Sequence, residues 1–243
     1  MRKLMIAMGG SIMLAAPLAQ ADVVGLGATV GYWNSDFSGH AAHGSDRVDL
    51  DSELNLSGKS NTDASIYIEH PIPVLPNVRL NYTLVKQDGR GNLGSPYDQV
   101  PAGNVHSDLD LEQLDLTLYY ELLDNWVNLD LGLTARKLSS ELVIREVGGS
   151  SKRSKTEVDA VIPMGYLSAR FDLPLTGLSA GGEGNFISYS GDSIRDFNVY
   201  GQYTVSILQL RAGYRQMAID YKDGKDRIDL KVDGPFFSAG VVF

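Results

Sequence analysis

Histidines close to carboxylates are the residues of this 243-residue chain whose types and spacing could carry chemistry. His40 and His43 share one polar stretch with Asp36 and Asp46, and such a set of nitrogen and oxygen donors suits a divalent metal. Nothing in the neighbouring sequence orders this stretch. We therefore interpret these side chains as solvated loop residues and predict no metal site.

The other two histidines could act as acid–base groups. His70 follows Glu69 at the start of a proline-rich stretch, where a histidine beside a carboxylate could serve as a general base. No serine nucleophile accompanies it, so a structural role in a turn is favoured. His106-Ser107, with Asp108 and Asp110 nearby, leaves a hydrolytic site open as an alternative. We expect no catalytic residue and no cofactor.

The first 21 residues have the three parts of a secretory signal peptide. Met1-Arg2-Lys3 is basic, residues 4–18 are almost uncharged, and Ala19-Gln20-Ala21 has the small-x-small form of a cleavage site. The apolar stretch is shorter than the roughly 20 residues that a membrane-spanning helix needs. We therefore expect cleavage after Ala21, which leaves residues 22–243 as a single β domain.

Charge and cysteine content exclude several classes of protein. The formal charge is −9, and removal of Arg2 and Lys3 with the signal peptide makes it −11. A nucleic-acid partner is not expected, because phosphate binding requires a basic face. The chain has no cysteine, so it forms no disulfide and lacks the residue that a bacterial lipoprotein acylates. A membrane location would therefore depend on the fold itself.

Ten segments alternate between apolar and polar residues with the period of a β-strand. They are residues 24–32, 64–69, 78–84, 114–122, 127–136, 161–172, 180–186, 197–205, 208–215 and 237–243. We predict an all-β, antiparallel barrel of ten strands with both termini on one side. Eight or twelve strands stay open, because residues 48–56 also alternate. We interpret those residues as a strand extension or ribbon within the first loop.

The connections alternate in length along the chain. Residues 71–77, 124–125, 174–177 and the region of Ser206 predict tight turns. The opposite connections are longer and polar, and they cover residues 34–63, 87–108, 147–157 and 221–227. Short turns on one side and long loops on the other are typical of an outer-membrane barrel, with the short turns and the termini in the periplasm.

The polar faces of the predicted strands decide between a soluble and a membrane barrel. They collect charges of both signs, whereas the opposite faces carry almost none near mid-strand. A charged side chain facing lipid would cost roughly 2–4 kcal/mol, so we place the polar faces in the lumen of a membrane barrel. We predict that its arginines and carboxylates pair across the lumen and largely fill it. The predicted lumen residues are Glu69, Arg79, Asp115, Asp130, Arg136, Arg170, Glu183, Arg211 and Arg215.

The last residues carry a second indication. Phe237, Ala239, Val241 and the final Phe243 alternate along one face. This pattern resembles the terminal signature of bacterial outer-membrane barrels, which the barrel-assembly machinery reads during biogenesis. The resemblance implies that this machinery is a partner of the chain and that its location is the bacterial outer membrane.

Two internal segments add a family resemblance. Gly31-Tyr32-Trp33 followed by residues 36–39 (DFSG), and residues 69–77 (EHPIPVLPN), look like marks of a family of small proteobacterial outer-membrane β-barrel proteins. The resemblance covers the N-terminal third through these segments and the rest only through the strand pattern. It implies a fold and a location, but the family has no defined activity and supplies no catalytic residue.

The function expected from the sequence is structural or surface-interacting, without enzymatic activity. A narrow channel for ions or small solutes, with arginines as the selectivity element, is one alternative. An outer-leaflet lipid or peptide hydrolase is another. Partners on the membrane would be lipid and lipopolysaccharide, whose phosphates could meet the basic loop residues Lys152, Arg153 and Lys155. Aromatic residues predicted at the membrane interfaces are Tyr32, Trp33, Trp126 and Tyr214.

Overall fold

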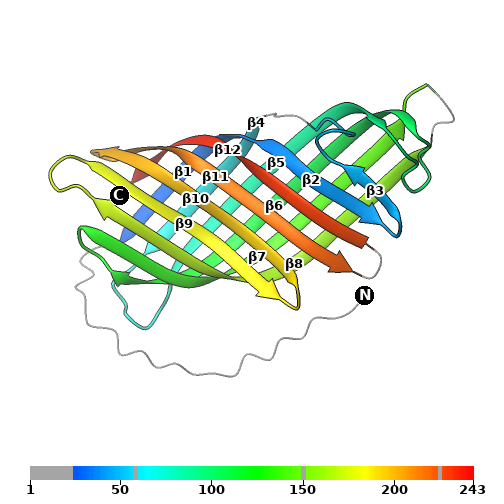
Figure 1. Ribbon diagram of the computed structural model, residues 1–243. Helices are drawn as coiled ribbons and strands as arrows, with labels where there is room; N and C mark the ends of the chain where they lie inside the picture. The colour runs from blue at the N-terminus through cyan, green and yellow to red at the C-terminus, as the bar shows by residue number, and fades with distance from the viewer. Residues whose placement is uncertain (1–23, 57–59, 149–151, 224–225) are drawn as a thin grey trace.

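The structure is a computed structural model that describes residues 24–243 except 57–59, 149–151 and 224–225 (Figure 1). The expected signal peptide, residues 1–21, lies outside the described residues. Within the part that is described, no helix is long and apolar enough to cross a membrane.

The described chain consists of twelve antiparallel strands. They are β1 (Gly25–Asn34), β2 (Asp36–His43), β3 (Asp46–Asp49), β4 (Ser60–Glu69), β5 (Asn77–Leu93), β6 (Gly103–Leu123), β7 (Val127–Glu146), β8 (Arg153–Asp172), β9 (Leu178–Tyr189), β10 (Asp192–Val205), β11 (Leu208–Asp223) and β12 (Asp226–Val242). Their hydrogen-bonded order is β1, β4 to β12 in sequence, then β2 and β3.

Pairing of β1 with β12 closes ten of these strands into a barrel, which confirms the predicted fold (Figure 1). The ladder joins Gly27 to Val242 at one end and Trp33 to Phe236 at the other. Reciprocal backbone bonds between Leu26 and Phe243 place the start of β1 beside the end of the chain. A closed barrel leaves no unpaired edge in its wall, which is the condition for a sheet to stand in lipid.

The strands β2 and β3 extend the wall rather than add to the ring. β2 continues along β12 where β1 stops, pairing Asp36 with Asp233 and His43 with Asp226. β3 then turns back against β2. Residues 46–56, here called the cap segment, thus occupy the end opposite the short turns. Of the predicted ribbon, residues 48–56, only Val48 and Asp49 are strand, at the end of β3. Residues 50–54 form turns, so most of that prediction was wrong.

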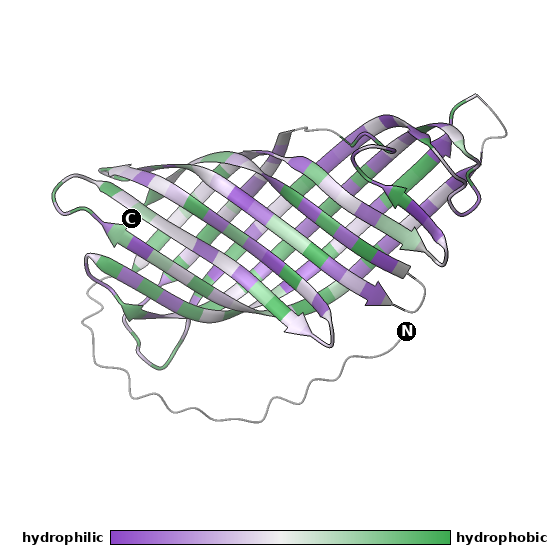
Figure 2. Cartoon of the chain, viewed as in Figure 1, coloured by the Kyte–Doolittle hydropathy of each residue, from purple (hydrophilic) through white to green (hydrophobic). Residues whose placement is uncertain are grey.

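Large apolar side chains face outward in a band around the barrel. On β6 they are Leu114, Leu116, Leu118 and Tyr120, all exposed. Every wall strand contributes to the band, and the alternation of hydrophilic and hydrophobic residues along the strands is visible in Figure 2. An outward apolar band is the surface that a bilayer covers.

In the half of the wall next to the cap segment, the apolar residues occupy the inward positions of the strands and the charged residues the outward positions. On β6 the leucines at 114, 116 and 118 point outward, but Leu109 and Leu111 point inward and are buried. Asp110 and Glu112 are the outward residues there, and they are exposed. The same wall therefore has a lipid-facing half and a half built like a water-soluble barrel.

This reversal corrects the predicted long loops. β5 runs on to Leu93, β6 starts at Gly103, and β8 starts at Arg153, so residues 87–93, 103–108 and 153–157 of the predicted loops are strand. Figure 1 shows β5 to β8 reaching past the other strands at this end. The charged residues that suggested loops form the outer, solvated face of these extensions.

The interior of the same half is apolar, so the expectation of a charged lumen holds for only part of the barrel. Buried Leu109, Ile144, Met217 and Leu230 come from different wall strands and belong to one hydrophobic cluster. The cap segment contributes buried Val48, Leu50, Leu54 and Leu56, which belong to the same cluster. Burial of these side chains stabilises this end at about 25 cal/mol per Å² of apolar surface.

Two glycines let the cap segment lie against the wall. A Cβ built at Gly91 would come within 1.8 Å of the Glu53 carbonyl oxygen, and one at Gly89 within 2.2 Å of the Leu54 carbonyl oxygen. The Gly94 amide and the Asp49 amide both donate to the Glu53 carboxylate, at 3.0 and 2.9 Å. The segment is thus fixed to the inner side of β5 by close backbone contact.

Candidate functional site: the charged lumen

A layer of four charged side chains crosses the lumen next to the apolar cluster, on the side of the short turns. Arg136 on β7 makes a bidentate pair with Asp115 on β6, at 2.8 and 2.7 Å, and also donates to Asp196 on β10 at 2.8 Å. Arg215 on β11 makes a second bidentate pair with Asp196, at 2.9 and 2.8 Å. All four are buried, with Arg136 only 1% exposed.

The layer spans the barrel because its members come from opposite walls. Arg215 also donates to Thr83 on β5, at 3.3 Å, so β11 is tied to β5 across the lumen. Buried ion pairs of this kind hold only when every charge has a good partner, since removing one leaves the other buried and uncompensated.

Trp33 belongs to this layer and not to a membrane interface, which corrects its prediction as a belt residue. It points inward from β1, is 1% exposed, and donates from its indole nitrogen to the Gly234 carbonyl at 3.2 Å. The Arg215 guanidinium lies over its ring, 4.7 Å from the centroid. The prediction was wrong because Trp33 follows outward Tyr32 on the strand and therefore faces the other side.

A second layer of charge lies nearer the short turns. Arg79 on β5 donates to the Glu183 carboxylate on β9 and to the Tyr166 hydroxyl, each at 2.8 Å. Three tyrosine rings surround its guanidinium, with centroids at 5.4 to 5.7 Å, from Tyr67, Tyr119 and Tyr166. Arg79 is thereby held in one position by an ion pair and by cation–π contacts.

Arg211 is less completely paired than the other lumen arginines. Its Nε donates to Gln202 at 2.6 Å, and its guanidinium lies 4.4 Å from the centroid of the Tyr200 ring. Its nearest carboxylate is that of Glu183, at 3.8 Å, which is too long for a hydrogen bond.

Three predicted members make no ion pair across the lumen, and the Asp130 carboxylate instead accepts a hydrogen bond from Ser168. Arg170 pairs with Asp172 two residues along its own strand, at 2.9 Å, and not across the lumen. Glu69 accepts from the Tyr119 hydroxyl at 2.7 Å. Among the described residues, no lysine or arginine nitrogen lies within 4 Å of Glu69 or Asp130. The sequence pattern places these side chains on the inward face of their strands, but the register of the barrel decides which of them pair.

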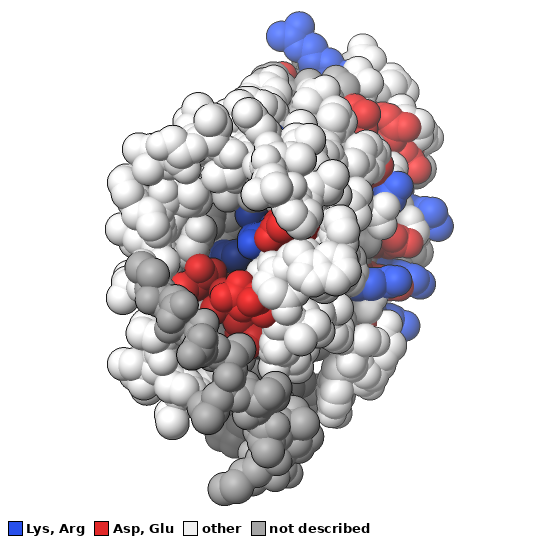
Figure 3. Space-filling view, turned by 90° about the vertical axis from the view of Figure 1, so that its left-hand side faces the viewer, with Lys and Arg blue, Asp and Glu red and all other residues white. Residues whose placement is uncertain are grey.

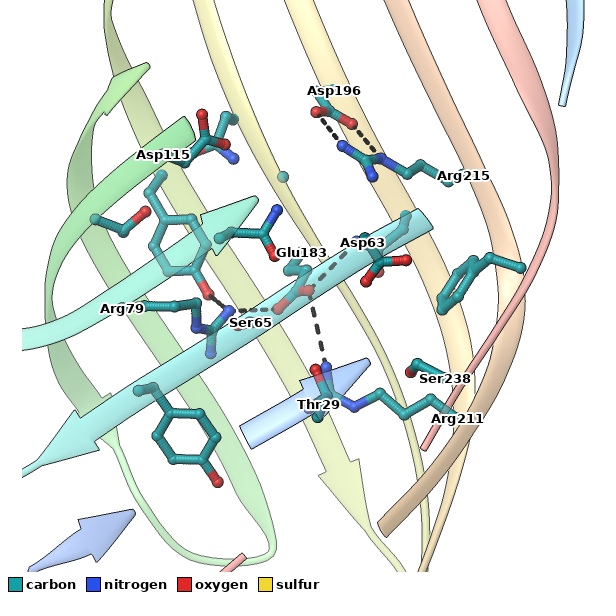
Figure 4. A pocket seen from close by; sticks show the side chains of 18 of the residues that line it. Thr29, Asp63, Ser65, Arg79, Asp115, Glu183, Asp196, Arg211, Arg215 and Ser238 are labelled. Atoms are coloured by element: carbon teal, nitrogen blue, oxygen red, sulfur yellow. Dashed lines mark hydrogen bonds and ion pairs between the residues drawn. The ribbon is translucent and has the colours of Figure 1, made fainter. Parts of the chain in front are cut away.

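The end with the short turns is hollowed, as Figure 3 shows, and acidic side chains line its opening with basic ones behind them. Behind this mouth lies a cavity of about 90 Å³, here called the chamber. Its lining includes Asp63, Arg79, Glu183, Arg211 and Ser238, and Figure 4 shows them converging from β4, β5, β9, β11 and β12. The chamber lies between the two charged layers.

Asp196 and Asp63 are site residues that the sequence analysis missed. Asp196 lies one residue before the predicted start of its strand, and Asp63 one residue before the start of another. Extending the alternation by one residue in each case places both carboxylates on the inward face. The period-2 pattern was therefore a sufficient signal, but the predicted strand ends were too short.

Among the described side chains, the histidines contact backbone groups or single carboxylates. His70 serves the turn that follows β4: its Nε2 lies 3.2 Å from the Pro76 carbonyl, and the Ile72 amide donates to its Nδ1. His106 lies 3.5 Å from Asp108, while Ser107 between them is buried on the opposite face of the strand. His40 Nδ1 lies 3.9 Å from Asp229. The side chain of His43 lies outside the described residues.

Within the residues that the structure describes, no cluster of three or more histidine, aspartate or glutamate side chains could hold a metal ion.

The predicted outward residues lie on the surface of the barrel. Phe237 and Phe243 are exposed on the outer side of β12, with Ala239 and Val241 between them. Tyr32, Trp126 and Tyr214 are exposed, and Trp126 packs edge-to-face on Phe171.

The basic stretch predicted to meet phosphates is partly neutralised in place. Lys152 and Arg153 are exposed, whereas Lys155 pairs with Glu141 at 3.1 Å and with Glu157 at 2.5 Å. Residues 149–151 lie outside the described part.

Comparison with known proteins gives structural neighbours but no family. The chain resembles a FadL homologue from Pseudomonas aeruginosa, with a TM-score of 0.40 and 11% identity over 93% of this chain and 91% of that one. It also resembles the toluene transporter TodX of P. putida, with a TM-score of 0.32 and 12% identity over 94% and 92%. No family model and no curated protein matches. At these TM-scores the likeness extends to neither a shared site nor a shared ligand.

Proposed function

We propose that this chain is an integral, non-enzymatic β-barrel of the bacterial outer membrane whose lumen is closed to free passage. Its role would be structural and surface-interacting. The observation that supports the closed lumen is its filling at two successive levels, by the layer around Arg136 and by the apolar cluster that includes the cap segment. An ion would have to cross both.

Conductance in planar bilayers tests the closed lumen. Barrels that conduct freely have a water-filled interior, whereas this one is crossed by ion pairs and sealed by packed leucines. We expect the folded barrel to give no steps of the size of a general porin. Steps of that size would contradict the proposal.

Placement in the outer membrane is proposed from the outward apolar band and from the signal peptide expected in residues 1–21. Heat modifiability tests it: protein from outer-membrane fractions is run on detergent gels with and without boiling. A folded barrel is expected to migrate faster unboiled. A soluble periplasmic protein without any mobility shift would overturn the placement and would favour a soluble binding protein.

Surface interaction is proposed from the charges just above the apolar band. The first outward charged residues on β5, β6, β7 and β8 are Lys86, Glu112, Lys137 and Asp159. They lie where lipopolysaccharide phosphates and their counterions would meet the protein. Reversing Lys86 and Lys137 to glutamate should weaken retention of lipopolysaccharide during purification, whereas reversing Lys222, outside this set of strands, serves as the control.

A narrow, gated channel is the second candidate, supported by the chamber that opens at one end and by a cap that is a single chain segment. Gly91→Ala should push the cap off β5, because the added Cβ would meet the Glu53 carbonyl. Gly94→Ala is the matched control, since its nearest neighbour, the Glu53 carboxylate, is at 3.4 Å. Small ion-selective steps only in Gly91→Ala would support the channel.

Absence of enzymatic activity is proposed from the opposed faces of His106 and Ser107. A nucleophile and its base must lie within hydrogen-bond reach of each other, and consecutive strand residues point apart. We expect His106→Ala and Ser107→Ala to leave any hydrolysis of lipid or peptide substrates unchanged from background. A loss of measurable hydrolysis in either variant would revive the hydrolase.

A further inference from the structure

Two opposite charges line the chamber without an ion pair between them. Asp63 has no lysine or arginine nitrogen within 4 Å among the described residues, and Arg211 reaches a carboxylate only at 3.8 Å. Both side chains line the chamber, as Figure 4 shows. The other three arginines of the lining each have a carboxylate partner, since Arg79 pairs with Glu183 and Arg136 and Arg215 pair with Asp196.

The register of the barrel explains the space between these two charges. Arg211 on β11 is paired with Ser238 on β12, Ser238 with Gly31 on β1, and Gly31 with Asp63 on β4. The four residues therefore form one row around the wall, with a serine and a glycine between the charges. A Cβ built at Gly31 would lie 2.2 Å from the Asp63 carboxylate, so only glycine leaves that carboxylate its place.

The remaining lining offers hydrogen bonds but no net charge. Four arginines and four carboxylates line the chamber, so their formal charges cancel. Asn198 Oδ1 and Gln209 Oε1 are buried side-chain acceptors in its wall without a hydrogen-bond partner. Buried polar groups are nearly always paired, and an unpaired one costs about 1–3 kcal/mol.

We propose that the chamber binds a small zwitterion, with its carboxylate at Arg211 and its ammonium group at Asp63. A simple anion would pair with Arg211 but would add a negative charge beside Asp63 and Glu183. A simple cation would meet the reverse penalty. A zwitterion satisfies both charges and keeps the chamber neutral.

The size of the chamber limits the ligand to a few heavy atoms. A cavity of roughly 150 Å³ holds a benzene molecule. The chamber, at about 90 Å³, fits a molecule of the size of the smallest amino acids. The open mouth at the short turns provides the route by which such a molecule reaches it (Figure 3).

Equilibrium dialysis of labelled glycine against the folded barrel in detergent tests the proposal on the unmodified protein. We expect saturable binding of one glycine per barrel, with acetate and methylammonium each binding at least about tenfold more weakly, as for loss of one charged hydrogen bond. No saturable glycine binding, or acetate binding as tightly as glycine, would overturn it. Neither outcome depends on whether the barrel conducts.

Variants assign the two ends of the ligand. Asp63→Asn and Arg211→Gln should each weaken glycine binding about tenfold or more, since each removes a charged partner. Arg170→Gln is the matched control, because Arg170 pairs with Asp172 and does not line the chamber. Folding of each variant is checked by heat modifiability, and Arg211→Lys replaces Arg211→Gln if the latter does not fold. Glycine binding unchanged in Asp63→Asn would reject the zwitterion in favour of a simple anion.

Discussion

The two halves of the barrel wall use the same strands under opposite rules. In the half with the short turns, leucines such as Leu116 face outward and polar side chains fill the interior. In the half with the cap segment, leucines such as Leu111 face inward and Glu112 and Asp110 face outward. One strand thus carries the pattern of a membrane barrel and of a soluble barrel in succession.

The point at which the apolar residues change from inward to outward positions marks where the surroundings of the wall change from water to lipid. Between Leu111 and Leu114 the apolar positions shift from odd to even numbers, and on β5 the outward series changes from Leu84 to Lys86 at the corresponding place. Because the outer face must match lipid on one side and water on the other, the phase of the alternation follows the solvent. The inward positions then carry polar residues where the outer face is apolar, and apolar residues where the outer face is charged.

The largest loss of stability is expected from a substitution in the ion-pair layer that separates the halves. Arg136→Met should lower the free energy of unfolding by about 3–5 kcal/mol, because Asp115 loses its partner and stays buried. Arg170→Met, which removes a pair about one third exposed to solvent, should cost about 1 kcal/mol or less. Urea titrations of the barrel in lipid vesicles measure both, and equal losses would show that the layer is no more important than the mouth.

Outward positions on β6 sharpen the boundary between the halves. Leu116→Arg should destabilise the barrel by about 2–4 kcal/mol, since the charge would face lipid. Glu112→Arg, four residues away on the same face, should change stability by about 0.5 kcal/mol or less because it faces water. The same urea titrations compare them, and similar costs at both positions would place the boundary elsewhere.

Neighbouring tyrosines distinguish the interior from the exterior. Tyr119 points inward and donates to the Glu69 carboxylate at 2.7 Å, whereas Tyr120 points outward and donates to the Val74 carbonyl at 3.0 Å. Tyr119→Phe should cost about 1.5–3 kcal/mol for a hydrogen bond to a charged group, and Tyr120→Phe about 1 kcal/mol or less. The reverse order of thermal stabilities would contradict the assignment of faces.

The smallest effect is expected at the cap, through pH. A hydrogen bond from the Ser52 amide, with one from Asp51, holds the pKa of Asp49 below its ordinary value. Its contribution to stability is therefore complete above the unfolded value near 3.9 and is lost as the pH falls through the lower folded pKa. The protection factor of the Ser52 amide against hydrogen exchange should fall below about pH 4, and Asp49→Asn should abolish that pH dependence.

Much of the fold followed from periodicity, and the exceptions have a common cause. Ten strands, their order and closure by the C-terminal strand were predictable because each strand alternates through the lipid-facing half. The extensions of β5 to β8 were not, since Lys86 and Asp110 look like loop residues once the phase has reversed. Asp196 and Asp63 were missed for the same reason, as the strands were ended where the lipid-facing alternation weakened.

Partner choice in the lumen could not be predicted at all from alternation. Facing inward makes Arg215 and Asp196 eligible to pair, but only the shear of the closed barrel decides which inward side chains lie at the same height. Arg170 illustrates the limit, because its partner is Asp172 on its own strand rather than a residue across the lumen.

Closure by β1 and β12 has a consequence for how the chain assembles. The indole of Trp33 and the carbonyl of Gly234 bond across 201 residues of sequence, so the contact that seals the ring is also among the most distant in the chain. Contacts of such high contact order are slow to form, whereas hairpins such as β6–β7 and β7–β8 can form locally. The barrel therefore cannot close before β12 is available. Until then β1 has an unpaired edge that could pair with strands of other chains unless it is shielded.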